Sequence, residues 1–180
     1  MKKWMLVITV LLSQSITAQK YFTRTGKTHF KASVAAFEPV AANNNSTTAI
    51  LKASTGDIAA QLFVSAFRFK VALMQEHFNE NYMDSDVYPK ATFKGRLEDF
   101  SLDKIASKKE LPLKGILTIK GKQKEIELLA SVELVNEHIK INAHFPVKPE
   151  NFGIKIPSIV RKKIAKEILI DIAYELVKKE

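Results

Sequence analysis

A regular alternation of apolar and polar side chains runs through most of this chain and limits the folds open to it. In the C-terminal run every second residue from Ile168 to Leu176 is apolar, while Glu167, Asp171 and Glu175 share the opposite face. Side chains of a β-strand point alternately to two faces, so this period of two predicts a strand with one buried face. Comparable rows occupy residues 58–64, 91–98, 111–120, 126–134 and 139–145. Less regular strands are expected at 20–25, 28–35 and 47–54, which makes eight or nine strands and an all-β protein.

The residues between the rows indicate how the strands are connected. Gly121-Lys122 and Asn136-Glu137 separate alternating runs, as tight hairpin turns do, and hairpins join antiparallel strands. Gly95 and Gly115 fall inside strands, where glycine marks a bulge or a sharp bend of the kind that a closed sheet requires. The polar stretch Ala41–Thr48 (AANNNSTT) is predicted to be a solvated loop. We therefore expect a closed antiparallel β-barrel of about eight strands.

One segment departs from the period of two. Between residues 71 and 83 the apolar side chains of Val71, Met74, Phe78 and Tyr82 recur at helical spacing, with polar residues on the other face. This spacing predicts a short amphipathic helix. A second irregular stretch, residues 146–163, contains three prolines and a glycine and is not expected to form a strand.

Aromatic content separates a water-soluble barrel from a membrane barrel, because both alternate apolar with polar residues. A membrane barrel carries girdles of aromatic side chains at both interfaces, but the only tryptophan here is Trp4. The polar rows are also densely charged with lysine and glutamate, as a surface facing water is. We therefore expect a water-soluble barrel.

The N-terminus has the layout of a secretory signal peptide. Lys2 and Lys3 precede the apolar run Trp4–Leu12, and a small, polar stretch follows up to Ala18. We expect cleavage after Ala18, a periplasmic or secreted protein, and one domain over residues 19–180. The formal net charge of +9 favours an anionic partner, including transient contact with a membrane surface. Export makes nucleic acid a poor candidate for that partner.

No catalytic or metal-binding pattern emerges from the sequence. The absence of cysteine excludes disulfides, thiolate zinc sites and a cysteine nucleophile. His138 and His144 lie on one face of a strand but about 20 Å apart, too far to share an ion. Ser101 and Lys104 fit the S-x-x-K pattern of penicillin-recognising enzymes without its companion motifs. We expect no enzymatic activity, no metal and no cofactor.

Three motifs carry a resemblance to a known family. They are FRFKVALMQEHFNENYMDSDVYPKATFKG at 67–95, GILTIKG at 115–121 and NFGI at 151–154. In their order and spacing they resemble the YceI-like family of exported bacterial proteins, and the likeness covers residues 21–177. The resemblance implies a lipocalin-like barrel of eight antiparallel strands that binds polyisoprenoids or other long amphiphiles without catalysis. One departure is Phe30, which follows His29 where many members have a histidine-serine pair.

The site expected from these observations is the mouth of an apolar cavity, formed by the helix and its flanking strands. Large apolar side chains gather there, and His77 is a candidate polar contact for a ligand such as an isoprenoid or a fatty acid. The alternative is a structural or stress-related interaction protein whose barrel is filled by its own side chains. The predicted ligand-binding residues are Phe67, Phe69, Leu73, Met74, His77, Phe78, Tyr82 and Phe93.

Overall fold

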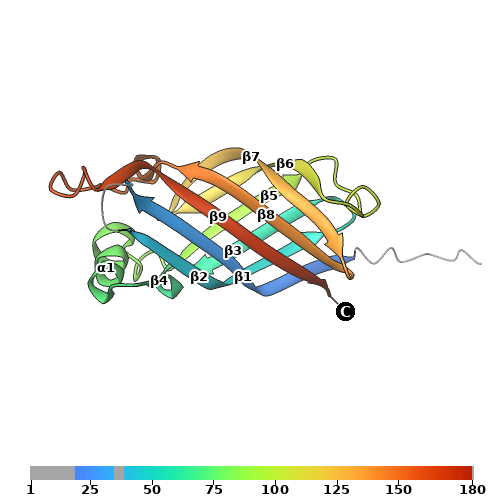
Figure 1. The fold of residues 1–180 in the computed structure, drawn as a ribbon, viewed down its shortest axis with the longest axis horizontal. Coiled ribbons are helices and arrows are strands. Elements are labelled where there is room, and N and C mark those ends of the chain that lie inside the picture. The colour runs from blue at the N-terminus through green and yellow to red at the C-terminus, as the bar shows by residue number, and fades with distance from the viewer. Residues whose placement is uncertain (1–18, 35–38, 180) are drawn as a thin grey trace, which may run out of the picture.

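Eight antiparallel strands close into a barrel in the computed structural model, which describes residues 19–34 and 39–179 (Figure 1). They are β1 (Lys20–Ser33), β2 (Ala41–Lys52), β3 (Asp57–Phe63), β5 (Lys90–Leu97), β6 (Lys109–Ile119), β7 (Lys122–Val135), β8 (His138–Val147) and β9 (Ile164–Lys178). Their order around the barrel is β1-β9-β8-β7-β6-β5-β3-β2, and β2 pairs with β1 to close it. The two-residue β4 (Arg68–Phe69) adds to the start of β2. The predicted all-β fold and closed barrel are confirmed.

The helical segments all lie between strands. A 3-10 turn η1 (Val64–Ala66) precedes β4, and a second one, η3 (Pro149–Phe152), follows β8. The helix predicted over 71–83 consists of α1 (Ala72–His77), continued by a π-helical stretch η2 (Phe78–Met83). None of the helices within the described ranges is long and apolar enough to span a membrane.

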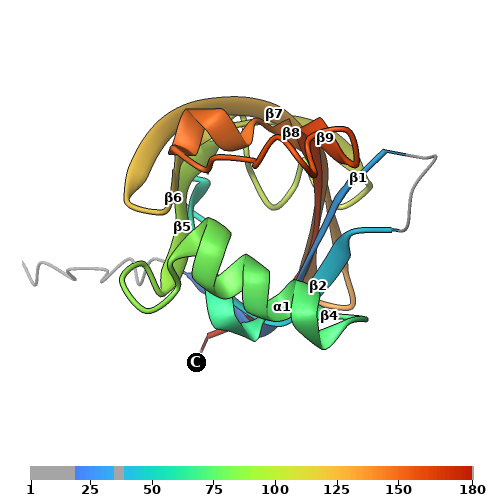
Figure 2. The ribbon, with the colours of Figure 1, turned by 90° about the vertical axis from the view of Figure 1, so that its left-hand side faces the viewer.

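The two ends of the barrel are built differently. At one end, which we call the mouth end, α1 and η2 lie opposite η3 and the segment 153–163 (Figures 1 and 2). At the other, closed end, the loop 98–108 places Ile105 against the core, where its backbone carbonyl accepts a hydrogen bond from Leu134 N at 2.7 Å. The predicted signal peptide, residues 1–18, lies outside the described residues.

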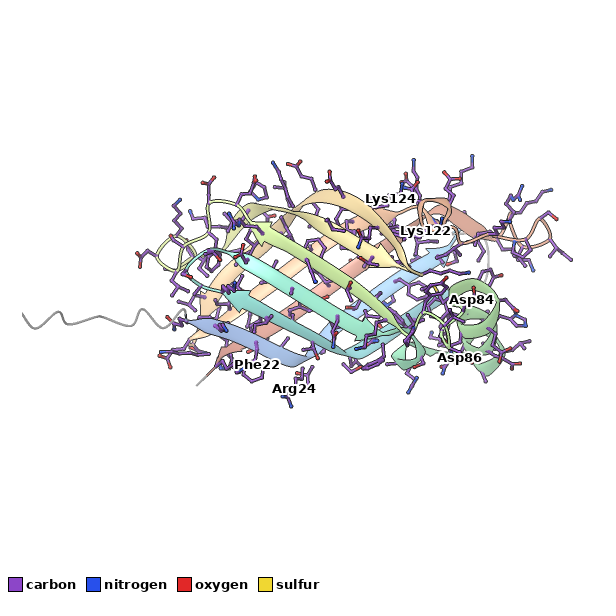
Figure 3. All side chains as sticks on the ribbon, turned by 180° about the vertical axis from the view of Figure 1, so that it is seen from behind. Phe22, Arg24, Asp84, Asp86, Lys122 and Lys124 are labelled. Atoms are coloured by element: carbon purple, nitrogen blue, oxygen red, sulfur yellow. The ribbon has the colours of Figure 1, made fainter. Side chains whose placement is uncertain are left out.

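The side chains alternate as the sequence predicts. On β1, Tyr21 and Thr23 are buried, whereas the intervening Phe22 and the following Arg24 point outward from the barrel (Figure 3). On β9, Tyr174 and Leu176 belong to the core, and the even-numbered isoleucines before them face the interior. The inward assignment of the residues from Ile168 to Leu176 is therefore confirmed.

The expectation of a loop at 41–48 is wrong, because these residues form the first two thirds of β2. Two of their polar side chains, Asn44 and Thr47, are buried, whereas Asn43, Asn45 and Ser46 are exposed. Asn44 is fully buried, its Nδ2 donates to Phe63 O at 3.0 Å, and its Oδ1 accepts from Ser46 N at 2.9 Å. The polar composition predicted solvation here, whereas hydrogen bonds to neighbouring strands allow Asn44 and Thr47 to be buried.

Two details of the strands also differ from the predictions. The strands expected at 20–25 and 28–35 are one strand, β1, whose register with β2 shifts on both sides of Gly26. A Cβ at that position would lie 2.7 Å from the ring of Tyr174, so only glycine fits there without displacement. The β6–β7 turn is Lys120-Gly121, one residue earlier than expected, with φ of 49° and 71°. The predicted Asn136-Glu137 turn is confirmed by φ of 49° and 65°.

Gly95 and Gly115 are paired directly across β5 and β6, and the register continues through them without a bulge. The ring of Phe93 lies over both, 2.6 and 2.7 Å from where their Cβ atoms would be. The glycines therefore make room for an aromatic side chain on the inner face of the barrel.

Candidate functional site

An apolar cavity of about 480 Å³ occupies the half of the barrel nearest the mouth end. All eight strands of the barrel contribute to its lining, and the short β4 adds Phe69. The remaining lining residues belong to helical segments and loops. The lining residues that are exposed to solvent include His77 and Lys163 at the mouth end, whereas Thr28, Thr47 and Tyr174 at the inner end are buried. The cavity therefore opens toward the mouth end and has a floor inside the barrel.

Four phenylalanine rings form one wall of this cavity under the helix. Phe30 of β1 packs against Phe67, Phe69 and Phe78 with ring centroids 5.1 to 5.7 Å apart, in edge-on and stacked arrangements. Phe78 also contacts Phe67 and Phe69. Aromatic pairs of this geometry stabilise a fold beyond their buried area, so the cluster holds the helix against the barrel.

Seven of the eight residues predicted for the site line the cavity. They are Phe67, Phe69, Met74, His77, Phe78, Tyr82 and Phe93. Whether they contact a ligand stays a prediction.

Leu73 is the one predicted residue that does not line the cavity. Its side chain is 56% exposed and does not reach the cavity. Successive residues of an α-helix are rotated by about 100°, so Leu73 points away from the wall that Met74 joins. The sequence motif could not distinguish the two, because both are apolar and adjacent.

The floor of the cavity carries a small group of hydroxyls. Thr28 Oγ1 shares hydrogen bonds with Thr47 Oγ1 at 2.8 Å and with Tyr174 OH at 3.2 Å. Burial raises the pKa of the Tyr174 hydroxyl above its ordinary value of 10.0, and the bonds to the two threonines oppose this rise. The hydroxyls therefore stay neutral and mutually bonded at physiological pH.

Several cavity residues were not anticipated from the sequence. Phe30 was noted only as a departure from the family pattern, yet it is central to the aromatic wall. The mouth is also lined by residues of a segment that was not expected to contribute to the site: Ile154, Ile156, Val160 and Lys163. The available signal was a row of isolated apolar residues within an irregular, basic stretch.

His138 and His144 face outward, as expected. His138 Nδ1 donates to Glu175 Oε1 at 2.7 Å and His144 Nδ1 donates to Asp171 Oδ1 at 2.5 Å, both on the outer surface of β8 and β9. Within residues 19–34 and 39–179, no three histidine or carboxylate side chains gather as metal ligands would.

Solved structures with the same fold come from several bacteria. A polyisoprenoid binding domain from Saccharophagus degradans, implicated in plant cell wall breakdown, superposes with a TM-score of 0.75 at 11% identity, covering 89% of this chain and 98% of that one. Burkholderia cenocepacia BcnA gives 0.71 at 17% identity, covering 84% and 96%. The YCEI protein of Campylobacter jejuni gives 0.62 at 16% identity, covering 80% and 87%.

The comparison of this sequence with models of protein families identifies its family. None of the curated proteins matches the chain significantly. The model of the YceI-like domain matches residues 15–176, which is nearly the whole chain and includes all three motifs of the resemblance. The chain belongs to the YceI-like family.

Proposed function

We propose that this protein binds a long-chain amphiphile, such as an isoprenoid, inside its barrel and carries or sequesters it without catalysis. The observation that carries the proposal is the cavity of about 480 Å³, which is apolar on nearly all its walls and opens at one end of the barrel. Its volume lies within the roughly 300–1,000 Å³ of small-molecule sites in proteins.

The energetics of such a site favour a hydrocarbon chain. Each methylene buried from water contributes about 0.8 kcal/mol, so a chain of several methylenes binds tightly with few polar contacts. Met74 and the phenylalanines suit this task because thioether and aromatic groups adapt to flexible apolar ligands. The similar fold of the Saccharophagus degradans domain, which is described as polyisoprenoid binding, supports the same ligand class.

Filling the cavity tests the proposal. Met74→Trp and Ala91→Phe each enlarge a side chain that lines the cavity, on the helix and on β5 respectively. If each displaces about two methylenes of ligand, affinity for a fluorescent fatty acid or isoprenoid probe falls roughly tenfold. Titration followed by fluorescence measures the change, and circular dichroism verifies the fold.

Leu73→Trp provides the matched control, because it adds the same ring to the exposed face of the same helix. We expect its probe affinity to equal that of the unchanged protein. Probe binding that persists in both filled variants would contradict the proposal and favour an interaction protein as the alternative. Organic extraction of the native protein followed by mass spectrometry should recover a lipid at near-stoichiometric yield.

We also propose that the protein acts after export, in the periplasm or outside the cell. The support is the order of charged, apolar and small residues over 1–18. N-terminal sequencing of protein from its producing cells should find Gln19 first. An intact Met1 in the soluble cytoplasmic fraction would contradict export.

A further inference from the structure

The segment 153–163 at the mouth end is strongly basic. Between Glu150 and Glu167 the chain contains five basic residues and no acidic one. All five are exposed, and no ion pair between described residues involves any of them. They are Lys155, Arg161, Lys162, Lys163 and Lys166. The segment therefore presents an excess of positive charge beside the opening of the cavity that its residues line. Figure 1 shows the course of this segment at the mouth end.

The same segment exposes an isoleucine. Ile159 is 86% exposed, more than any other large apolar residue of the described chain. Its neighbour Val160 lines the cavity, and the backbone between them is fixed by turns, with Val160 N donating to Pro157 O at 3.1 Å and Lys163 N to Val160 O at 2.8 Å. An ordered turn thus directs the side chain of Ile159 into solvent and that of Val160, the next residue, into the cavity.

The opposite side of the opening repeats this combination on a smaller scale. Leu73 and Val71, at the start of α1, are exposed next to the exposed Arg68 and Lys70. Glu76 and Glu80 follow on the helix, so most of the positive charge belongs to the 153–163 segment. Met74 of α1 and Val160 of that segment line the same cavity, which places the two apolar projections on either side of its opening.

We propose that the mouth end docks on the surface of an anionic lipid bilayer, with Ile159 and Leu73 entering the interface and the surrounding cations contacting headgroups. Charge and apolar exposure coincide here, and an interfacial anchor requires both. An anionic protein as the partner would explain the basic residues, but it would not explain the exposed Ile159 among them. In this orientation the cavity opens onto the membrane, a consequence that rests on the proposed function.

Binding to lipid vesicles tests the proposal. The assay uses protein purified from the soluble fraction, and sequencing determines its N-terminus. We expect co-sedimentation with vesicles of mixed phosphatidylcholine and phosphatidylglycerol, little with phosphatidylcholine alone, and weaker binding as salt is raised. Each lysine or arginine near such a surface strengthens binding roughly fivefold. The triple variant Lys155→Gln, Arg161→Gln, Lys162→Gln should therefore bind on the order of 100-fold more weakly.

The matched control removes as much charge from the closed end, through Lys108→Gln, Lys109→Gln and Lys179→Gln. This triple variant should retain nearly full vesicle binding, whereas Ile159→Ser combined with Leu73→Ser should lose most of it. Equal loss in both charge variants would show attraction by net charge alone and would overturn the proposal, as would no binding by the unchanged protein. Because none of the substituted residues lines the cavity, probe binding in solution reports on the proposed function separately.

Discussion

The closed half and the mouth half of the barrel are built from the same strands but differ in what fills them. Near the closed end, Leu97, Ile139 and Ile141 have no appreciable exposure and pack with Ile105 of the 98–108 loop. Near the mouth, Ile168 and Ile170 point into the barrel with the same alternation, yet they line a cavity. An inward-pointing strand residue is therefore not always closely packed: in the closed half it contacts other side chains, and in the mouth half it borders a cavity.

The connections between strands account for the difference. The loop 98–108 enters the barrel end and contributes Ile105, Phe100 and Leu102 to the core. At the mouth, α1, η2 and the segment 153–163 contribute to the sides of the opening. A barrel of eight strands is just wide enough either to be filled by side chains or to hold a small ligand. In this barrel, the loops at one end fill the interior with side chains, and those at the other end leave a cavity.

The largest expected effect compares the same substitution in the two halves. Ile141→Ala should lower the free energy of unfolding by about 3–4 kcal/mol, because it leaves a void among fully packed neighbours. Ile170→Ala should cost only about 1 kcal/mol, because Ile170 already borders a cavity. Urea unfolding measures both, and equal losses would contradict the distinction between the halves.

Most of the fold could be predicted from the sequence because alternation reports directly on strand faces. The loop expected at 41–48 failed because the burial of Asn44 depends on the carbonyl of Phe63, a partner nineteen residues away. The candidate site was largely anticipated from a dense run of apolar residues over 67–93. The contributions of Phe30 and the 153–163 segment could not be predicted from the sequence, because only closure of the barrel brings these distant parts of the chain to one cavity.

A smaller effect is expected at the floor of the cavity, where the two halves meet. Tyr174→Phe should cost about 0.5–1 kcal/mol at neutral pH, since the 3.2 Å bond to Thr28 is lost while Thr28 and Thr47 remain bonded. A larger cost would mean that the hydroxyls are part of the packed half. Chemical unfolding of both proteins at neutral pH measures the difference.

The same variant changes the pH dependence of stability. Burial raises the pKa of Tyr174 in the folded state, so above pH 10.0 the unfolded chain loses a proton that the folded protein retains. Stability should therefore be intact below that pH and decrease as the pH rises through the folded-state pKa. Tyr174→Phe should reduce this alkaline decrease without abolishing it, because burial also raises the pKa of Tyr21. An unchanged alkaline slope would contradict the assignment.

The smallest effect is expected on the outer surface, where the halves should not differ. Glu175→Gln removes the partner of His138 over the closed half, and Asp171→Asn removes that of His144 over the mouth half. Both pairs are exposed, so each variant should shift the thermal midpoint by less than about 3 °C at neutral pH.

The pH dependence of the closed-half pair has a definite sign. The hydrogen bond from His138 lowers the pKa of Glu175, so the contribution of the pair is present above the carboxyl's ordinary pKa of 4.5 and is lost as the pH falls through the folded-state value. Glu175→Gln should remove that part of the acid dependence. Glu175→Gln could instead lower the thermal midpoint at neutral pH far more than Asp171→Asn does. The two halves would then differ on their outer surfaces as well, and the packing of the interior alone would not explain the stability of the closed end.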